Sequence, residues 1–173
     1  VEESGDVQDF LNAYMDGQVC VVGGFRSQLI HNKILFAILH DDGLNGYLSE
    51  TERQFVKDHI PFTKLFTPGQ EELINSLKGD KNRFLLKPLD KFAGHGVCIG
   101  RDYPLERWED VVEEKKEESY VAQEFCNVPA REMIHVNDGD VSIDNFNYLI
   151  GVFLYNGELS GLYTRAGREN LIG

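Results

Sequence analysis

A lysine and two glycines near the middle of this chain have the types and spacing that suit phosphate binding. The stretch 83–100 reads RFLLKPLDKFAGHGVCIG, so an apolar run carries Lys87 into a glycine-bearing turn, and a second apolar run follows. Gly94 and Gly96 allow backbone N–H groups to approach an anion, because neither residue has a Cβ in the way. A lysine beside such a turn supplies the positive charge that a polyphosphate needs. An ordinary hairpin with a solvated lysine is the simpler alternative, and the neighbouring segments must decide between the two.

Further polar residues lie where charge or hydrogen bonding could serve a ligand. Lys33 interrupts a strongly apolar segment, where a solvated position is harder to accept than it is for the neighbouring Asn32. Gln123 and Glu124 are consecutive polar residues near the end of the strand-like run YVAQEF. Arg165 follows the last pair of strand-like runs, in the sequence LYTR. None of these residues identifies a chemistry on its own.

The composition indicates a globular chain with an acidic surface. Its 173 residues suffice for one domain or two small lobes with a real core, and the 42% hydrophobic content argues against disorder. The formal net charge of −12 argues against general nucleic-acid binding. Any phosphate site must therefore be a local basic spot within an acidic surface.

The cysteines and the lack of an export signal favour a cytoplasmic protein. Cys20, Cys98 and Cys126 are far apart and lie in or beside apolar runs, so we expect reduced core residues without metal-binding spacing. No apolar stretch approaches the length of a membrane span, and the amino terminus lacks a basic-then-apolar signal pattern. The chain opens at Val1 without an initiator Met, so we expect a fragment of a longer protein.

Periodicity and turn residues predict an α+β fold of two small lobes, with mostly antiparallel sheets flanked by helices. Helices are predicted, caps included, over 6–16, 27–40, 49–59, 67–78 and 105–118. Strands are predicted over 18–23, 84–87, 97–99 and 120–125, followed by antiparallel strands joined by turns at 137–139 and 156–157. Pro88 cannot donate to a sheet ladder, so pairing should stop there. We expect residues 1–80 to form a helical lobe with one strand, and 81–173 a lobe with the lysine hairpin, a hinge strand and the antiparallel sheet.

Five segments, taken in order, resemble the circularly permuted ATP-grasp family, the group that includes glutathionylspermidine synthetase. They are HNKILFAIL, a capped Glu-rich helix ending in IPFT, the lysine strand with its glycine turn, VAQEF, and GVFLYNGELSGLYTR. The resemblance extends over roughly residues 18–172, nearly the whole chain. Each segment is a weak signal alone, and the five in one order make a fairly specific one.

The resemblance implies roles for the basic and glycine residues. Lys33 and Lys87 would approach the α- and β-phosphates of ATP from two sides, as compact charges suited to that work. Gly94 and Gly96 would form a flexible lid over the phosphates. Arg165 would stabilise the transferred phosphoryl group or an acyl phosphate, because its planar guanidinium offers two parallel donors.

The same resemblance implies an adenine site and a reaction. Backbone groups of the strand at Gln123, Glu124 and Phe125 would read the adenine edge, and the Glu124 carboxylate would bind the ribose or the adenine amino group. The reaction would be ATP-dependent ligation, in which a small carboxylate attacks the γ-phosphate and an amine then displaces phosphate from the acyl phosphate. Protein groups would mainly position these reactants and neutralise charge.

Magnesium is the point at which this sequence departs from the family pattern. ATP-grasp enzymes hold Mg²⁺ with two acidic residues and an Asn, which in the permuted order precede the segment present here. Asp144, Asn145 and Asn147 are the nearest candidates, but their alternation with apolar residues is more typical of the outer face of a strand. We therefore expect no metal ligands in this chain, and no ligation by the chain alone.

Two alternatives stay open. One is a degenerate ATP-grasp module that binds nucleotide, or no ligand, and serves assembly without catalysis. The other is an unrelated small α+β domain in which the lysine hairpin is a coincidence. The sequence contains no Walker A pattern, Rossmann glycine fingerprint or kinase catalytic loop, which excludes the common rival nucleotide-binding folds.

Overall fold

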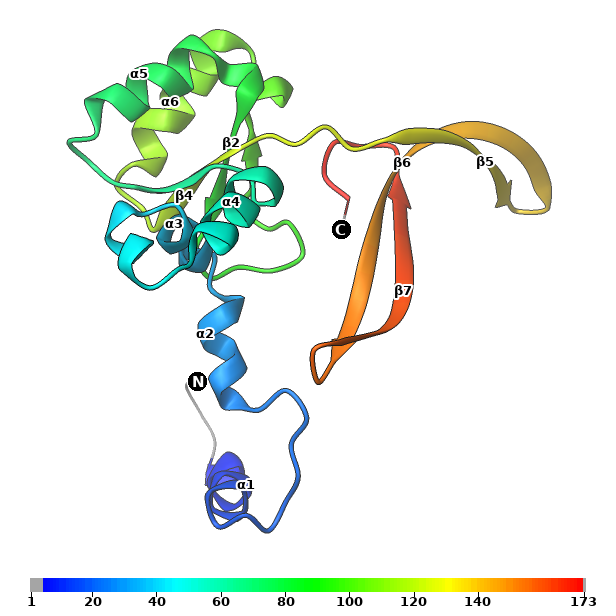
Figure 1. The fold of residues 1–173 in the computed structure, drawn as a ribbon. Coiled ribbons are helices and arrows are strands. Elements are labelled where there is room, and N and C mark those ends of the chain that lie inside the picture. Colours follow the sequence, from blue (N-terminus) through cyan, green and yellow to red (C-terminus); the bar gives the residue numbers. More distant parts are fainter. Residues whose placement is uncertain (1–4, 173) are drawn as a thin grey trace.

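A computed structural model describes residues 5–172 as helices and antiparallel sheets, which confirms the expected α+β class (Figure 1). The first sheet has four strands in the order β1-β4-β2-β3, and the second has three in the order β5-β6-β7. The first comprises β1 (Thr63–Phe66), β2 (Phe84–Pro88), β3 (Cys98–Ile99) and β4 (Tyr120–Glu124). The second comprises β5 (Ala130–Asn137), β6 (Asp140–Tyr155) and β7 (Glu158–Gly167). All paired strands run antiparallel.

Helices surround the first sheet, whereas the second sheet stands apart from them in Figure 1. The α-helices are α1 (Gly5–Met15), α2 (Gln28–His31), α3 (Ile34–Leu39), α4 (Glu50–His59), α5 (Glu71–Gly79) and α6 (Leu105–Lys115). Short 3-10 turns connect them, namely η1 (Phe25–Ser27), η2 (Asp42–Gly46), η3 (Lys81–Arg83) and η4 (Gly100–Asp102). No helix within residues 5–172 is long and apolar enough to cross a membrane.

The main core lies between one face of the first sheet and the helices α5 and α6. Trp108 of α6 is fully buried, and its indole N–H donates to the carbonyl of Leu77 in α5 over 2.7 Å. Around this pair pack buried side chains from both helices and from β1, β2, β3 and β4. The first sheet takes β1 from the predicted lobe 1–80 and β2, β3 and β4 from the predicted lobe 81–173. Residues on both sides of position 80 therefore share one core.

The opposite face of the first sheet carries the polar residues of interest. Because successive side chains of a strand alternate between faces, Leu85 and Lys87 of β2 share this face with Val121 and Gln123 of β4. Thr63 of β1 lies opposite Gln123 on the same face. Leu85 and Val121 are buried there, and α3 lies against β1 at the edge of the sheet. This face, unlike the core face, is therefore the one near α3 in the amino-terminal half of the chain.

Two predicted elements in the amino-terminal half are wrong. The predicted strand 18–23 is irregular chain without a sheet partner, and its Val22 is among the most exposed apolar residues. The single predicted helix 27–40 is broken into η1, α2 and α3, because Asn32 adopts an extended conformation (ψ 127°). The Asn32 side-chain oxygen accepts the N–H of Ile34 over 3.0 Å. A side-chain acceptor of this kind competes with the helical backbone and ends the helix.

Other local predictions are confirmed, with shifts at the element ends. Ser49 and Glu52 form the reciprocal capping box that starts α4. Helix α5 begins at Glu71, later than predicted, because Gly69 has a φ of 81° that no α-helix accommodates. Pro88 is the last residue of β2, so pairing ends there as expected. Both hairpin turns of the second sheet lie at the predicted places, with positive φ at residues 138, 139, 156 and 157.

The expectation that all three cysteines are core residues is wrong for two of them. Cys98 is buried in β3, whereas Cys20 and Cys126 are exposed. Cys20 lies in the segment that lacks a sheet partner, and Cys126 lies just beyond the end of β4. An apolar sequence neighbourhood buries a thiol only where the chain also forms an element that packs. All three are free cysteines.

Candidate functional site

Lys87 lies half-buried at the end of β2 and begins a chain of hydrogen bonds across three strands. Its Nζ donates to the side-chain oxygen of Gln123 in β4 over 2.7 Å. The Gln123 amide nitrogen donates in turn to the hydroxyl of Thr63 in β1 over 2.8 Å. The Thr63 hydroxyl then donates to the carbonyl of Pro61 over 2.8 Å. The side chain of Lys87 is therefore held in one orientation by the sheet itself.

The charge of Lys87 is destabilised where it lies. Burial lowers the pKa of its ammonium below the ordinary value, and the positive charge of nearby Lys33 lowers that pKa further. The exposed thiol of Cys126 also lies close enough to act on Lys87, in the opposite direction. Among the ion pairs formed by residues 5–172, none gives Lys33 or Lys87 a carboxylate partner. The ammonium groups of Lys33 and Lys87 therefore lie near each other in a partly buried position, without a carboxylate partner among residues 5–172.

Lys33 reaches the glycine turn from the break between α2 and α3. Its backbone N–H donates to the carbonyl of Leu89 over 3.0 Å, and its Nζ donates to the carbonyl of Lys91. Both carbonyls belong to the turn that follows Lys87. The helix break at Asn32 thus places Lys33 against this turn, on the same site as Lys87.

The glycine turn has the backbone conformation that its glycines predict. Gly94 and Gly96 have φ values of 73° and 74°, a region that other residues rarely adopt. A Cβ on Gly94 would lie 2.6 Å from a methyl of Leu171, and one on Gly96 would lie 3.1 Å from the Tyr120 hydroxyl. Phe92, at the tip, is largely exposed. The turn therefore has an open tip and closely packed glycines.

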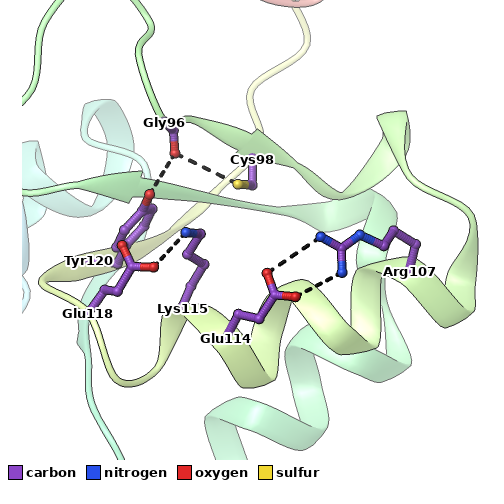
Figure 2. A network of polar contacts seen from close by, with 7 residues as sticks. All are labelled: Gly96, Cys98, Arg107, Glu114, Lys115, Glu118 and Tyr120. Atoms are coloured by element: carbon purple, nitrogen blue, oxygen red, sulfur yellow. Dashed lines mark hydrogen bonds and ion pairs between the residues drawn. The ribbon is translucent and has the colours of Figure 1, made fainter.

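Tyr120 holds the end of this turn in place (Figure 2). Its hydroxyl donates to the carbonyl of Gly96 over 3.0 Å, and the Cys98 thiol lies 3.7 Å from the same oxygen. Burial raises the pKa of the Tyr120 phenol, so the donor keeps its proton at neutral pH. The ammonium of Lys115 lies 5.2 Å from the centre of the Tyr120 ring and pairs with Glu118. The turn is thus anchored to α6 and β4.

Backbone groups at the end of β4 are occupied by the sheet. The N–H of Glu124 donates to the Phe62 carbonyl over 2.8 Å, and the N–H of Phe125 donates to the Arg83 carbonyl over 2.7 Å. The Glu124 carboxylate lies 3.3 Å from Nε of Arg83. Because β4 is paired on both sides, these N–H groups do not face an open edge that a base could approach. Only the side chain of Gln123 joins the lysine site.

Arg165 lies in β7 of the second sheet, opposite Leu149 of β6. Its guanidinium lies 5.3 Å from the centre of the Tyr163 ring. β7 pairs with β6 in the second sheet, whereas Lys87 lies on β2 of the first sheet and Lys33 lies at the break before α3. The fold thus brings together both lysines, the glycine turn and Gln123, and leaves Arg165 outside that group.

The acidic and amide residues of β6 make separate contacts. Asp144 accepts a hydrogen bond from Arg168 over 2.8 Å and lies 3.8 Å from the His135 ring. Asn147 donates to the carbonyl of Glu169, while Asn145 lies opposite Glu132 of β5. Among the described residues, no three His, Cys, Asp or Glu side chains are grouped so that they could hold a metal ion. Asp144 and Asn145 are consecutive in β6 and therefore point to opposite faces, and Asp144 is less exposed than Ile143, so these residues do not form the single outer face that the alternation indicates.

Sequence reasoning missed a groove of about 710 Å³ between α3, η2 and β1. Its lining is mixed. The apolar residues are Ile34, Ala37, Ile38, Leu44, Phe62 and Leu65, and the polar ones are His40, Asp41, Asp42, Thr63, Lys64 and Gln70. The groove forms because β1 is an edge strand and because α3, which begins after the helix break at Asn32, packs against β1. No local sequence signal reports either feature. Its end at Ile34 directly follows Lys33, so the groove adjoins the lysine site.

Comparison of the chain with protein-family models gave no match, and comparison with curated proteins gave none either.

Proposed function

We propose that this chain binds ATP through Lys33, Lys87 and the glycine turn, as the nucleotide-binding portion of an ATP-dependent carboxylate–amine ligase of the circularly permuted ATP-grasp type. The observation that carries the proposal is the convergence of the two lysines on the turn around Gly94 and Gly96. Lys33, from the break before α3, donates to the carbonyls of Leu89 and Lys91 in this turn, and Lys87 lies at the end of β2 where the turn begins, close enough for the charge of Lys33 to act on it.

Electrostatics support a polyphosphate as the ligand. Bringing Lys33 and a half-buried Lys87 together costs free energy, which appears as a lowered pKa of Lys87. A bound anion between the two ammonium groups would remove that cost. A net charge of −12 makes such a cationic spot unusual on this molecule. The open tip of the turn lets a polyphosphate approach from solvent.

Each group has a defined part in binding. Gln123 fixes the Lys87 ammonium, and Thr63 fixes Gln123, so the lysine is oriented before the ligand arrives. Preorganised donors of this kind bind the developing charge of phosphoryl transfer without reorganisation. ATP is used as its Mg²⁺ complex in ligases of this type, and the metal neutralises phosphate charge. Among residues 5–172, no three acidic, histidine or cysteine side chains are grouped so that they could hold a magnesium ion.

A nucleotide-binding module without ligase activity is the second candidate. It is favoured by one observation, the position of Arg165 in a different sheet from the lysines. Addition of ATP, Mg²⁺ and a panel of carboxylates and amines distinguishes the two candidates. Sustained phosphate release that Arg165→Ala abolishes supports the ligase, and ATP binding without release supports the module.

The proposal is tested by thermal unfolding with and without ATP or inorganic tripolyphosphate. Both ligands should raise the Tm of the unmodified chain, and Lys33→Met or Lys87→Met should remove most of that rise. Lys57→Met is the control, because Lys57 is an exposed lysine of α4 that belongs neither to the lysine site nor to the lining of the groove. Equal Tm rises in all four proteins, or no rise in any, would contradict the proposal.

A further inference from the structure

The hydrogen bonds between β1 and β4 show which backbone N–H and C=O groups of β1 point toward its free edge. The N–H of Glu124 donates to the carbonyl of Phe62, so these two residues form a hydrogen-bonded pair of the β1–β4 ladder. Such pairs alternate along antiparallel strands, so Lys64 bonds to Ala122. The backbone groups of Thr63 and Leu65 therefore point away from β4. Since β1 has no strand on its other side, they point toward the edge.

That edge faces the groove of about 710 Å³ that α3 and η2 complete. Thr63 and Leu65 both line it, and the rest of the lining combines apolar residues of α3 with polar residues that include Asp41, Asp42 and Gln70. The carbonyl of Thr63 and the N–H of Leu65 flank Lys64, so an acceptor and a donor lie side by side. Among the hydrogen bonds within residues 5–172, none engages either group. An acceptor next to a donor, in a groove that is partly apolar, matches the N6 amino group and N1 of adenine.

We propose that this groove binds the adenine base, with the Thr63 carbonyl accepting from N6 and the Leu65 N–H donating to N1. The inference rests on the proposed ATP-binding function, and it assigns the base to the edge of β1 instead of the central strand β4. Ile34 in the groove wall directly follows Lys33, and Thr63 is joined through Gln123 to Lys87. A nucleotide with its base in the groove therefore directs its phosphates toward both lysines.

Side chains occupy the backbone groups at both ends of the free β1 edge, which favours a small planar ligand over an extended peptide. The His40 ring lies 3.0 Å from the carbonyl of Pro61, and the side chain of Gln70 accepts the N–H of Thr67 over 3.0 Å. The Pro61 carbonyl and the Thr67 N–H that make these contacts point away from β4, as the backbone groups of Thr63 and Leu65 do. An added peptide strand needs a longer open edge than these two residues provide. The free backbone groups of Thr63 and Leu65, between Pro61 and Thr67, instead suit the two hydrogen bonds of one base.

Nucleoside discrimination gives the first test, by calorimetry or NMR titration with adenosine and inosine. Inosine carries a donor at N1 and an acceptor at O6, so both groups oppose the backbone pair. Adenosine should bind at least about tenfold more tightly, because each lost hydrogen bond to a buried group costs on the order of 1 kcal/mol. The Leu65 amide proton should shift downfield with adenosine, while that of Lys64, already in the ladder, should not. Equal affinity for the two nucleosides would overturn the proposal.

Two variants locate the site. Leu65→Pro deletes the proposed donor, and proline is tolerated at an edge-strand position whose N–H is outside the ladder. Ala37→Trp fills the groove, with Phe36→Trp as the matched control, because Phe36 is on the same helix and does not line the groove. Leu65→Pro and Ala37→Trp should each weaken adenosine at least tenfold, and Phe36→Trp should not. Far-UV circular dichroism checks that each variant is folded.

Tripolyphosphate separates this inference from the proposed function. It has no base, so its binding should survive Leu65→Pro and Ala37→Trp. Tripolyphosphate binding without adenosine binding overturns the base site and leaves the phosphate site standing. If adenosine binds equally well to the Ala37→Trp protein, the base binds outside the groove, and the inference is overturned. Failure of both probes overturns the inference and the proposed function together.

Discussion

The two sheets of this molecule differ in what covers them. The first is buried on the face toward α5 and α6 and largely buried on the other, with Trp108 and Val121 fully enclosed. The second sheet exposes large apolar side chains along all three strands, and Ile143 of β6 is 68% exposed. Ile134 of β5 lies directly opposite Ile143 and is exposed as well. Backbone pairing and contacts between exposed side chains therefore hold the second sheet together, whereas the first sheet also has a buried core.

This difference shows where a site can be preorganised. Lys87 is held by Gln123 and Thr63 because the first sheet is fixed by its core. Arg165 lies beside the Tyr163 ring, on a sheet in which no residue within the described range 5–172 is buried. We therefore expect binding groups of the first sheet to act as a rigid unit. Contributions from the second sheet depend on what packs against its apolar faces.

The largest predicted effect contrasts one buried and one exposed side chain. Trp108→Ala should lower the free energy of unfolding by about 3–5 kcal/mol, because it leaves a cavity and strips the Leu77 carbonyl of its donor. Ile143→Ala should cost less than about 0.5 kcal/mol, as for exposed positions generally. Urea unfolding measures both. A large cost for Ile143→Ala would show that the second sheet is covered in solution.

Hydrogen exchange should separate the two sheets next. Amides of β4 should exchange only through global unfolding, because that strand is paired on both sides within the core. Amides of β6, also a central strand, should show protection factors at least about tenfold lower, since few buried contacts support them. Equal protection in β4 and β6 would break the comparison.

A smaller effect is expected for the anchor of the glycine turn. Tyr120→Phe removes the donor to the Gly96 carbonyl and should cost about 1 kcal/mol of stability. It should also weaken tripolyphosphate binding, because the turn loses a fixed point. Tyr155→Phe, on the exposed end of β6, is the matched control and should change neither quantity. A Tyr120→Phe protein with unaltered stability and affinity would show that the hydroxyl is dispensable.

The smallest effect concerns the charge of Lys87. Lys87→Met should change the free energy of unfolding by less than about 1 kcal/mol at neutral pH, since a buried charge is removed while Gln123 loses a donor. Between the lowered folded pKa and the unfolded pKa of about 10.4, the unfolded chain binds more protons at Lys87. In that window Lys87 makes stability rise with pH. The stability difference between unmodified chain and variant should therefore depend on pH there, and a constant difference would contradict the assignment.

Much of the first sheet could be predicted because its signals are local. The apolar run before Lys87, the stop at Pro88 and the two turn glycines each act within a few residues. The contact between Lys33 and the turn could not be predicted. It depends on a helix break at Asn32, whereas the apolar periodicity predicts one continuous helix there. The free edge groups of Thr63 depend on strand order, which no local pattern encodes.

The second sheet shows the opposite limit. Its turns at 137–139 and 156–157 were predictable from Asp-Gly and Asn-Gly signals. Its exposure was not, because alternating apolar residues predict a face that is covered without identifying the cover. The position of Arg165 outside the lysine site follows from the same separation of the sheets.

The most direct test of the central claim is the pKa of the Lys87 ammonium, measured by NMR with and without ATP. Burial and the charge of Lys33 should hold that pKa below about 10.4 in the free chain. Bound phosphate places negative charge beside the ammonium, so the pKa should rise on addition of ATP, and it should rise less in Lys33→Met. ATP that binds and leaves the pKa of Lys87 unchanged would contradict the account.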